Sequence, residues 1–140
     1  MRRRDVPTPA RTLDALAPER AARVRRLHRM TSVIDAHGDS FRFVVWGERR
    51  LYERSNKGQV DFPRALEGGL GAQIHNILLP RPKGRLMVHA ILKTYRYVVE
   101  DLRAGAHLAM LATSVEDIEA ARRDGKFAVI LGLEGGEALE

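Results

Sequence analysis

Two residues with metal-ligating side chains, His37 and Asp39, stand one position apart at the end of a short β-rich run. In an extended backbone, side chains two positions apart point to the same face, so both can reach one ion. Asp35 lies two residues before His37 and could orient it by accepting the second ring N–H. The alternative is a surface turn, because Asp, Gly and Ser are common turn formers.

A third candidate ligand, Glu134, follows the apolar run 127–133 and precedes two glycines. A carboxylate at the end of a buried strand is costly unless it is paired or bound to a metal. The carboxyl ends of parallel barrel strands form one rim, where active sites are built. We therefore expect His37, Asp39 and Glu134 to converge on that rim, although Glu-Gly-Gly also suits an exposed turn.

The composition restricts the kind of site that is expected. The 140 residues include no cysteine, which excludes disulfides, thiolate metal sites and cysteine nucleophiles. Histidine, aspartate and glutamate are the ligands that suit hydrolytic zinc or similar divalent ions. His75 lies among the apolar residues of a predicted strand and His89 on an amphipathic helix, so neither is expected to bind metal. The sequence has neither a glycine-rich phosphate loop nor a serine elbow.

Strand-like and helix-like segments alternate along the chain after residue 30. Strands are predicted from β-rich or continuous apolar runs, and helices from apolar residues that recur every three or four positions. Ser114 can cap the second helix, with Asp117 in place of the capping-box glutamate. The alternation indicates an α/β architecture with a parallel sheet or barrel. The predicted strands are 31–35, 68–79 (ended by Pro80, Pro82 and Gly84), 107–112 and 127–133, the helices are 86–103 and 115–123, and 46–60 is a surface loop.

The net charge of +6 comes from residues 1–30, which hold nine arginines and three acidic residues. Residues 31–140 are electrically balanced, with 15 basic and 15 acidic side chains. Apolar residues recur every three or four positions between Ala17 and Met30, which predicts a basic leader helix. The alternative is a basic arm that binds nucleic acid or a membrane surface, but no aromatic residue interleaves the arginines to stack on bases.

The sequence gives no sign of membrane insertion or export. No stretch approaches the roughly 18 uninterrupted apolar residues that a spanning helix needs. The arginines at the start are not followed by an apolar segment, so a secretory signal is not expected. The prediction is a cytoplasmic protein that binds neither nucleic acid nor membrane.

Several motifs follow one another in a fixed order along the chain. The first is Val-Ile-Asp-Ala-His-Gly-Asp at 33–39, and the others are the segments 60–64, 67–73, 112–118, 124–126 and 131–136. Together they resemble the membrane (renal) dipeptidase family of zinc metallopeptidases, and its bacterial members in particular. The resemblance covers residues 31–140, and the order and spacing of its motifs make it specific.

This resemblance implies a fold and an activity. The family has a (β/α)8 TIM-type barrel, like other metallo-dependent hydrolases, with two zinc ions at the rim. By motif position, His37 and Asp39 would hold the first zinc and Glu134 would bridge both. The implied reaction is hydrolysis of the peptide bond of dipeptides, including some with a C-terminal D-residue, by a metal-activated hydroxide. The complete enzyme could also form a homodimer.

Two departures limit what the resemblance carries over. In the family, two later histidines complete the second zinc site, and a substrate-binding arginine and a proton-shuttling aspartate come later still. This sequence stops at Glu140, so we expect 31–140 to form an incomplete barrel that is inactive alone. Ser40-Phe41-Arg42 and Glu137 also differ from the residues expected there.

A second enzyme class, amidohydrolase-like barrels with one metal, remains as an alternative. Such enzymes are expected to carry His-x-His at the first strand, whereas this chain has His-x-Asp there. The basic-arm binding module ranks below both enzymes, because the balanced body offers no second contact surface for an anion.

Overall fold

The computed structural model describes residues 16–77 and 85–135. The chain divides into two compact units, residues 1–31 and residues 32–140. In the first unit, α1 (Pro18–Met30) is a helix of 13 residues, where the sequence predicts one. Ala21 is buried along it, while Leu27 and Met30 are about half exposed. The start of the predicted leader lies outside the described residues.

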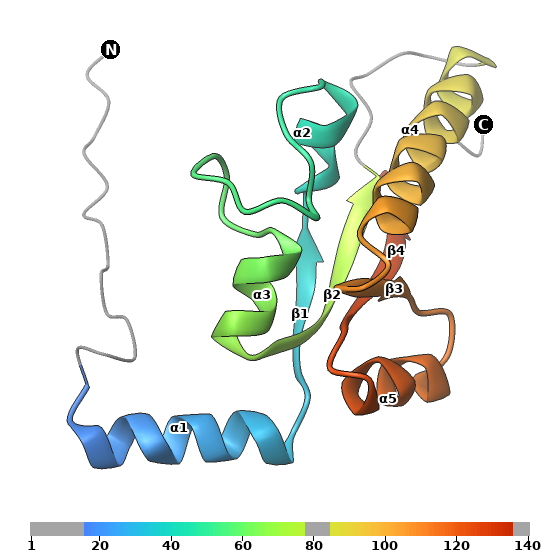
Figure 1. Cartoon of the computed structure of the whole chain (residues 1–140). Helices are drawn as coiled ribbons and strands as arrows, with labels where there is room; N and C mark the ends of the chain where they lie inside the picture. Colours follow the sequence, from blue (N-terminus) through green and yellow to red (C-terminus); the bar gives the residue numbers. More distant parts are fainter. Residues whose placement is uncertain (1–15, 78–84, 136–140) are drawn as a thin grey trace. The chain divides into compact units, whose positions relative to one another are not determined.

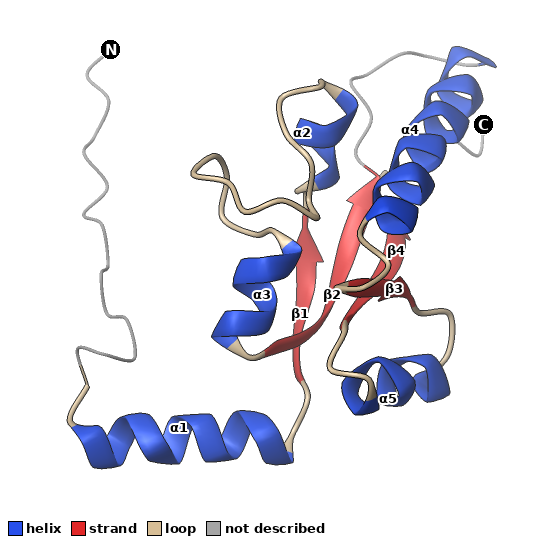
Figure 2. Cartoon of the chain, in the orientation of Figure 1, coloured by secondary structure: helices blue, strands red, loops and turns tan. Residues whose placement is uncertain are grey.

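The second unit is built on a sheet of four parallel strands (Figures 1 and 2). The strands are β1 (Val33–Gly38), β2 (Leu70–Ile77), β3 (Ala109–Leu111) and β4 (Phe127–Leu133), in the order β1-β2-β4-β3. Thus β4, rather than β3, lies beside β2. The short β3 pairs with the first three residues of β4. Within the described ranges, the rest of that edge of β4 has no strand partner.

Three helices connect β1, β2 and β3 and lie on one side of the sheet: α2 (Phe41–Val45), α3 (Phe62–Gly68) and α4 (Arg85–Ala104). A fourth, α5 (Val115–Arg123), connects β3 to β4 and lies on the other side. The connection from β2 skips one strand position to reach β3 at the edge of the sheet, and the next connection returns to β4, which lies between β2 and β3. Because parallel crossovers are right-handed, this reversal places α5 on the face opposite α3 and α4.

The hydrophobic core has two clusters, one on each face of the sheet. The larger cluster packs α2, α3 and α4 against β4, and Phe127 and Val129 of that strand are fully buried in it. A smaller cluster of alanines from β2, β4 and α5, with Ala112, forms on the opposite face. The alternation of side chains along β4 therefore sends Phe127 and Val129 to one face and Ala128 to the other.

The structure agrees with several of the predicted elements. β4 has the predicted bounds, α4 matches the predicted helix within one residue at each end, and the Ser114–Asp117 capping box is formed. β1 begins later than predicted and extends through His37. The prolines and glycine expected to end the second strand lie outside the described residues. Among the described residues, no helix has the length and apolar character needed to cross a bilayer.

Two short helices, α2 and α3, are not predicted from the sequence. Asp61 caps α3 by accepting a hydrogen bond from the Arg64 amide at 2.9 Å, and Pro63 occupies its first turn. Gly69, with φ of 75°, ends the helix in the left-handed conformation. The glycines at 68 and 69 therefore end a helix, and β2 begins at Leu70 rather than at Gly68.

The predicted surface loop, 46–60, contains neither helix nor strand, but two buried charged side chains hold it. Arg49 donates to the carbonyls of Lys57 and Val60, the latter at 2.7 Å. Asp101 of α4 accepts a hydrogen bond from the Leu51 amide at 2.7 Å. Burial raises the pKa of Asp101, more strongly than this hydrogen bond and Arg50 lower it. These contacts fix the loop that follows α2 and leads to α3.

Candidate metal centre

The candidate ligands lie where β1 and β4 end, on either side of β2. Gly38 pairs with His75 of β2, and Asn76 pairs with Gly132 of β4. The Glu134 amide donates to the Ile77 carbonyl at 3.4 Å. These pairings bring the ends of the three strands to the same level, so residues almost a hundred positions apart become neighbours.

The structure brings His37, Asp39 and Glu134 together. Each offers a potential ligand atom, and the three atoms lie within 4.8 Å of one another. Nε2 of His37 is 3.6 Å from Asp39 Oδ1 and 3.6 Å from Glu134 Oε2. Across residues 16–77 and 85–135, no other group of three such side chains meets this condition.

The chemistry of this group fits a divalent cation. One imidazole and two carboxylates form a ligand set suited to zinc. Asp39 Oδ1 is buried and has no hydrogen-bond partner among the described residues, an arrangement that is costly unless something positive lies nearby. The three side chains keep substantial exposure, at 60%, 33% and 42%, so an ion can reach them from solvent.

Asp35 does not make the contact predicted from the sequence. Its Oδ1 accepts a hydrogen bond from the backbone amide of His37 at 3.2 Å, and its Oδ2 accepts one from the side chain of Gln73. The ring nitrogens of His37 instead lie near the side-chain amide of Asn76, and Nε2 also lies near the carboxylates of Asp39 and Glu134. The reason is geometric: register shifts occur in β1 between Asp35 and Gly38, so the two side chains no longer follow simple alternation.

Two residues of the site, Asn76 and Gly132, are not predicted from the sequence. A Cβ built on Gly132 would lie 2.5 Å from Asn76 Oδ1, so the absence of a side chain there makes room for the amide. The only sequence signal is the alternation along β2, which separates Asn76 from His75. That signal acquires meaning only when the register with β4 is known.

His75 is a core residue, as its position among apolar neighbours predicts. It is fully buried, with its ring 4.8 Å from that of Phe41 and 6.1 Å from that of Phe127. Burial lowers its pKa to about 4, so the ring is neutral at pH 7. Neither ring nitrogen has a hydrogen-bond partner in the described part of the chain.

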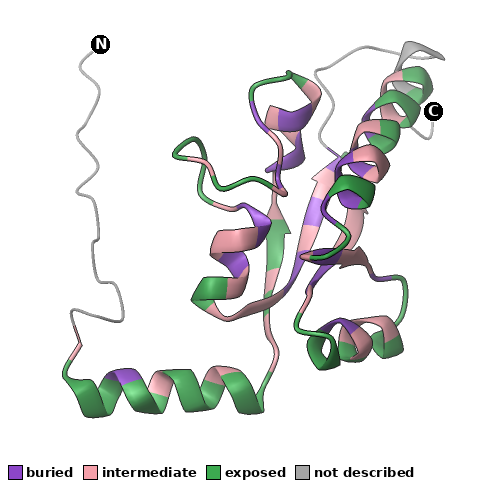
Figure 3. Ribbon diagram, in the orientation of Figure 1, coloured by how far each residue is buried: buried purple, intermediate pink, exposed green. Residues whose placement is uncertain are grey.

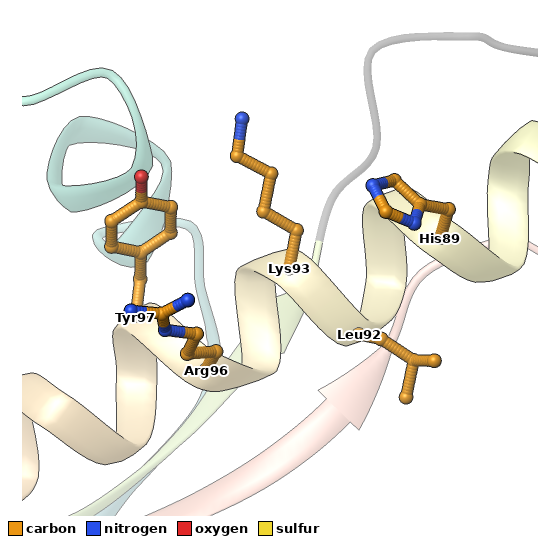
Figure 4. A pocket seen from close by; sticks show the side chains of 5 residues that line it. All are labelled: His89, Leu92, Lys93, Arg96 and Tyr97. Carbon is orange, nitrogen blue, oxygen red and sulfur yellow. The ribbon is translucent and has the colours of Figure 1, made fainter.

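A hollow along α4 lies outside this group (Figure 4). Its lining residues come from one helix, and His89, Lys93 and Tyr97 project from the same side of it in Figure 4. Arg96 is paired with Glu100 at 2.8 Å. None of the described residues that line the hollow carries a carboxylate, so none of them offers His89 a partner ligand. They are His89, Leu92, Lys93, Arg96 and Tyr97.

Comparison with known families gives a match over most of the chain. Residues 21–140 match the sequence model of the membrane dipeptidases, peptidase family M19. The chain belongs to this family. Comparison with curated protein sequences gave no match.

Several solved structures are similar in fold to this chain. A dipeptidase of family M19 is 22% identical, with a TM-score of 0.65 over 76% of this chain. A metallopeptidase from Rhodobacter sphaeroides, liganded with a phosphinate mimic of the dipeptide L-Ala-D-Ala, is 20% identical, with a TM-score of 0.63 over 76% of this chain. The probable dipeptidase PvdM from Pseudomonas aeruginosa is 20% identical, with a TM-score of 0.69 over 88% of this chain.

These similarities confirm the predicted fold class, the N-terminal part of a (β/α)8 barrel of the metallo-dependent hydrolase type. The chain spans 36%, 39% and 33% of the length of the three structures. The place of this M19 chain's candidate ligands, at the carboxyl ends of parallel strands, is the active-site end of such a barrel.

Proposed function

We propose that this chain carries part of the metal centre of a zinc-dependent dipeptidase. The observation that supports the proposal most strongly is the convergence of His37, Asp39 and Glu134 at the carboxyl ends of β1 and β4. Membership of the M19 family supports the reaction class. The ligand assignment and the metal are our own inference.

Each of the three side chains has a role in this proposal. His37 would bind through Nε2, which lies 3.6 Å from a carboxylate oxygen of Asp39 and of Glu134. Asp39 supplies Oδ1, which has no hydrogen-bond partner among the described residues. Glu134 has two carboxylate oxygens and would contribute a third ligand, shared between two zinc ions if the centre holds two. When bound, zinc supplies Lewis-acid chemistry and makes water nucleophilic at neutral pH.

The proposed substrate is a dipeptide. The Rhodobacter sphaeroides structure, liganded with a mimic of L-Ala-D-Ala, supports the inclusion of dipeptides with a C-terminal D-residue among the substrates. The exposure of the three side chains in this chain leaves them accessible to such a small ligand.

We further propose that the complete centre needs ligands beyond this sequence. The described residues supply one group of three ligands, and the matched M19 dipeptidase is longer than this chain, which covers 36% of it. The 140-residue chain alone is therefore expected to bind zinc without hydrolysing dipeptides.

The test compares zinc content and dipeptide hydrolysis in this chain and in a longer protein that contains it. We expect hydrolysis of Ala-Ala dipeptides by the longer protein, and its loss on His37→Ala or Glu134→Gln. The His89→Ala variant is the matched control, because His89 is exposed on α4, outside the group. Unchanged zinc content and activity in the first two variants, or two tightly bound zinc ions in this chain alone, would contradict the proposal.

A further inference from the structure

Asn76 occupies the middle of the candidate centre, on the strand between the ligands. It lies on β2, which pairs with the His37 strand on one side and with the Glu134 strand on the other. Alternation along β2 places Asn76 on the same face as Ala72, the residue that packs with α5. Asn76 is therefore on the face opposite His75 and the larger core cluster.

The side chain of Asn76 contacts the ring of His37. Its amide nitrogen lies 2.9 Å from Nδ1 and 3.3 Å from Nε2. Nδ1 is therefore the ring nitrogen closer to Asn76, while Nε2 lies 3.6 Å from each of the two carboxylates. The amide nitrogen of Asn76 thus contacts both ring nitrogens, Nδ1 more closely, and the candidate ligand oxygens lie near Nε2.

These contacts impose a requirement on the proton of the ring. A neutral imidazole carries one proton, so a ring that binds an ion through Nε2 has its proton on Nδ1. That N–H needs an acceptor. The carboxamide of Asn76 can supply one, because a half-turn about its terminal bond exchanges the nitrogen for Oδ1. Gly132 has no side chain to obstruct this group.

We propose that Asn76 is a positioning residue that fixes the orientation and tautomer of His37, so that Nε2 is the metal-binding nitrogen. The inference rests on the proposed metal centre and adds a residue to it. Asn76 acts through His37 and does not itself bind the ion. Partners of this kind commonly contribute roughly 10- to 100-fold to metal affinity.

The experiment measures zinc affinity of the 140-residue chain by competition with a chelating dye. Asn76→Leu keeps the approximate size of the side chain and removes the acceptor, so affinity should fall roughly 10- to 100-fold. Asn76→Asp restores an acceptor oxygen and should keep affinity at or above that of the wild type. Asn56→Leu changes an exposed asparagine in the 46–60 loop and should have no effect.

A second measurement needs no variant. Nitrogen NMR of the His37 ring in the zinc-bound wild-type chain should show the proton on Nδ1. Zinc on Nδ1, or unchanged affinity in a folded Asn76→Leu variant, would overturn the role of Asn76. If His37→Ala still weakens zinc binding in that case, the metal centre itself stands. Equal zinc binding by the wild type and His37→Ala would overturn both.

Discussion

The two faces of the sheet differ sharply although they are built from the same strands. On the face covered by α2, α3 and α4, Phe127 and Val129 of β4 are completely shielded from solvent. On the other face, Ile34 of β1 is 49% exposed, and Glu134 follows β4 with 42% of its side chain exposed. Figure 3 shows both buried and exposed residues along the strands of this sheet. The alternation of side chains along these strands thus places residues that stabilise the fold on one face and residues suited to binding a metal on the other.

The position of α5 sharpens this contrast. It packs against Ala72 and Ala128, which lie towards the beginnings of β2 and β4. The opposite ends of the same strands carry Asn76 and Glu134. The second face is therefore covered at the start of the strands and accessible at their carboxyl ends, where the three candidate ligands meet.

The face packed against α2, α3 and α4 is called the covered face below, and the face that carries Asn76 and Glu134 is called the open face. The largest expected effect on stability is on the covered face. Phe127→Ala removes a fully buried ring that packs near Phe62 and His75, and should lower the free energy of unfolding by about 3–5 kcal/mol. Ile34→Ala, on the open face, should cost well under half as much because Ile34 is 49% exposed. Urea unfolding followed by circular dichroism measures both. Equal losses would show that the faces do not differ in this way.

The second prediction uses the buried histidine on the covered face. The pKa of His75 is lowered from 6.5 to about 4 in the folded chain, so between these values the unfolded chain binds more protons. Stability should therefore be fully present above pH 6.5 and fall as the pH drops towards 4, by up to about 3 kcal/mol. His75→Phe should reduce this slope in pH-dependent urea unfolding.

The control for this prediction is His89→Gln, because His89 is exposed on α4. It should leave the pH dependence as in the wild type. The assignment to His75 would be wrong if both variants had the same slope as the wild-type chain.

A third prediction concerns the open face. Gly132→Ala would place a Cβ 2.5 Å from Asn76 Oδ1, which must displace the amide from His37. Zinc affinity should fall roughly tenfold, within the range for a lost outer partner of a metal ligand. The control is Gly68→Ala, because a Cβ at Gly68 would meet open space, and this variant should leave zinc affinity unchanged. Gly125→Ala is not used as a control, because the φ of 66° at Gly125 favours glycine.

The smallest effect is expected at α5. Ser114 accepts a hydrogen bond from the Asp117 amide at 3.2 Å and caps this helix. Ser114→Ala should lower the free energy of unfolding by about 1 kcal/mol, with no change in zinc affinity because α5 covers only the beginnings of the strands. A loss of zinc binding in this variant would mean that the two ends of the open face are coupled.

Residues with strong local signals can be predicted from the sequence. The run Phe127–Leu133 is continuously apolar because it is buried on the covered face and partly covered on the other, and its bounds agree with the prediction. The candidate ligands His37, Asp39 and Glu134 stand at strand ends, and the change from apolar to polar residues marks these positions in the sequence.

Features that depend on pairing between distant segments cannot be predicted in this way. The order β1-β2-β4-β3 follows from how β3 pairs with β4, and no local pattern encodes it. The helix α3 is hard to predict because Gly68 and Gly69, which end it, also suit the start of a strand. Asn76 becomes part of the site only through its register with Gly132 and its contact with His37.

The most direct test of the three converging side chains is a zinc titration of the 140-residue chain. It compares the wild type with His37→Ala, Glu134→Gln and the exposed control His89→Ala. We expect the wild type and the control to bind zinc with equal affinity, and both other variants to bind it much more weakly. If all four chains bind zinc equally, or if none binds it, His37, Asp39 and Glu134 do not form a metal centre in this chain.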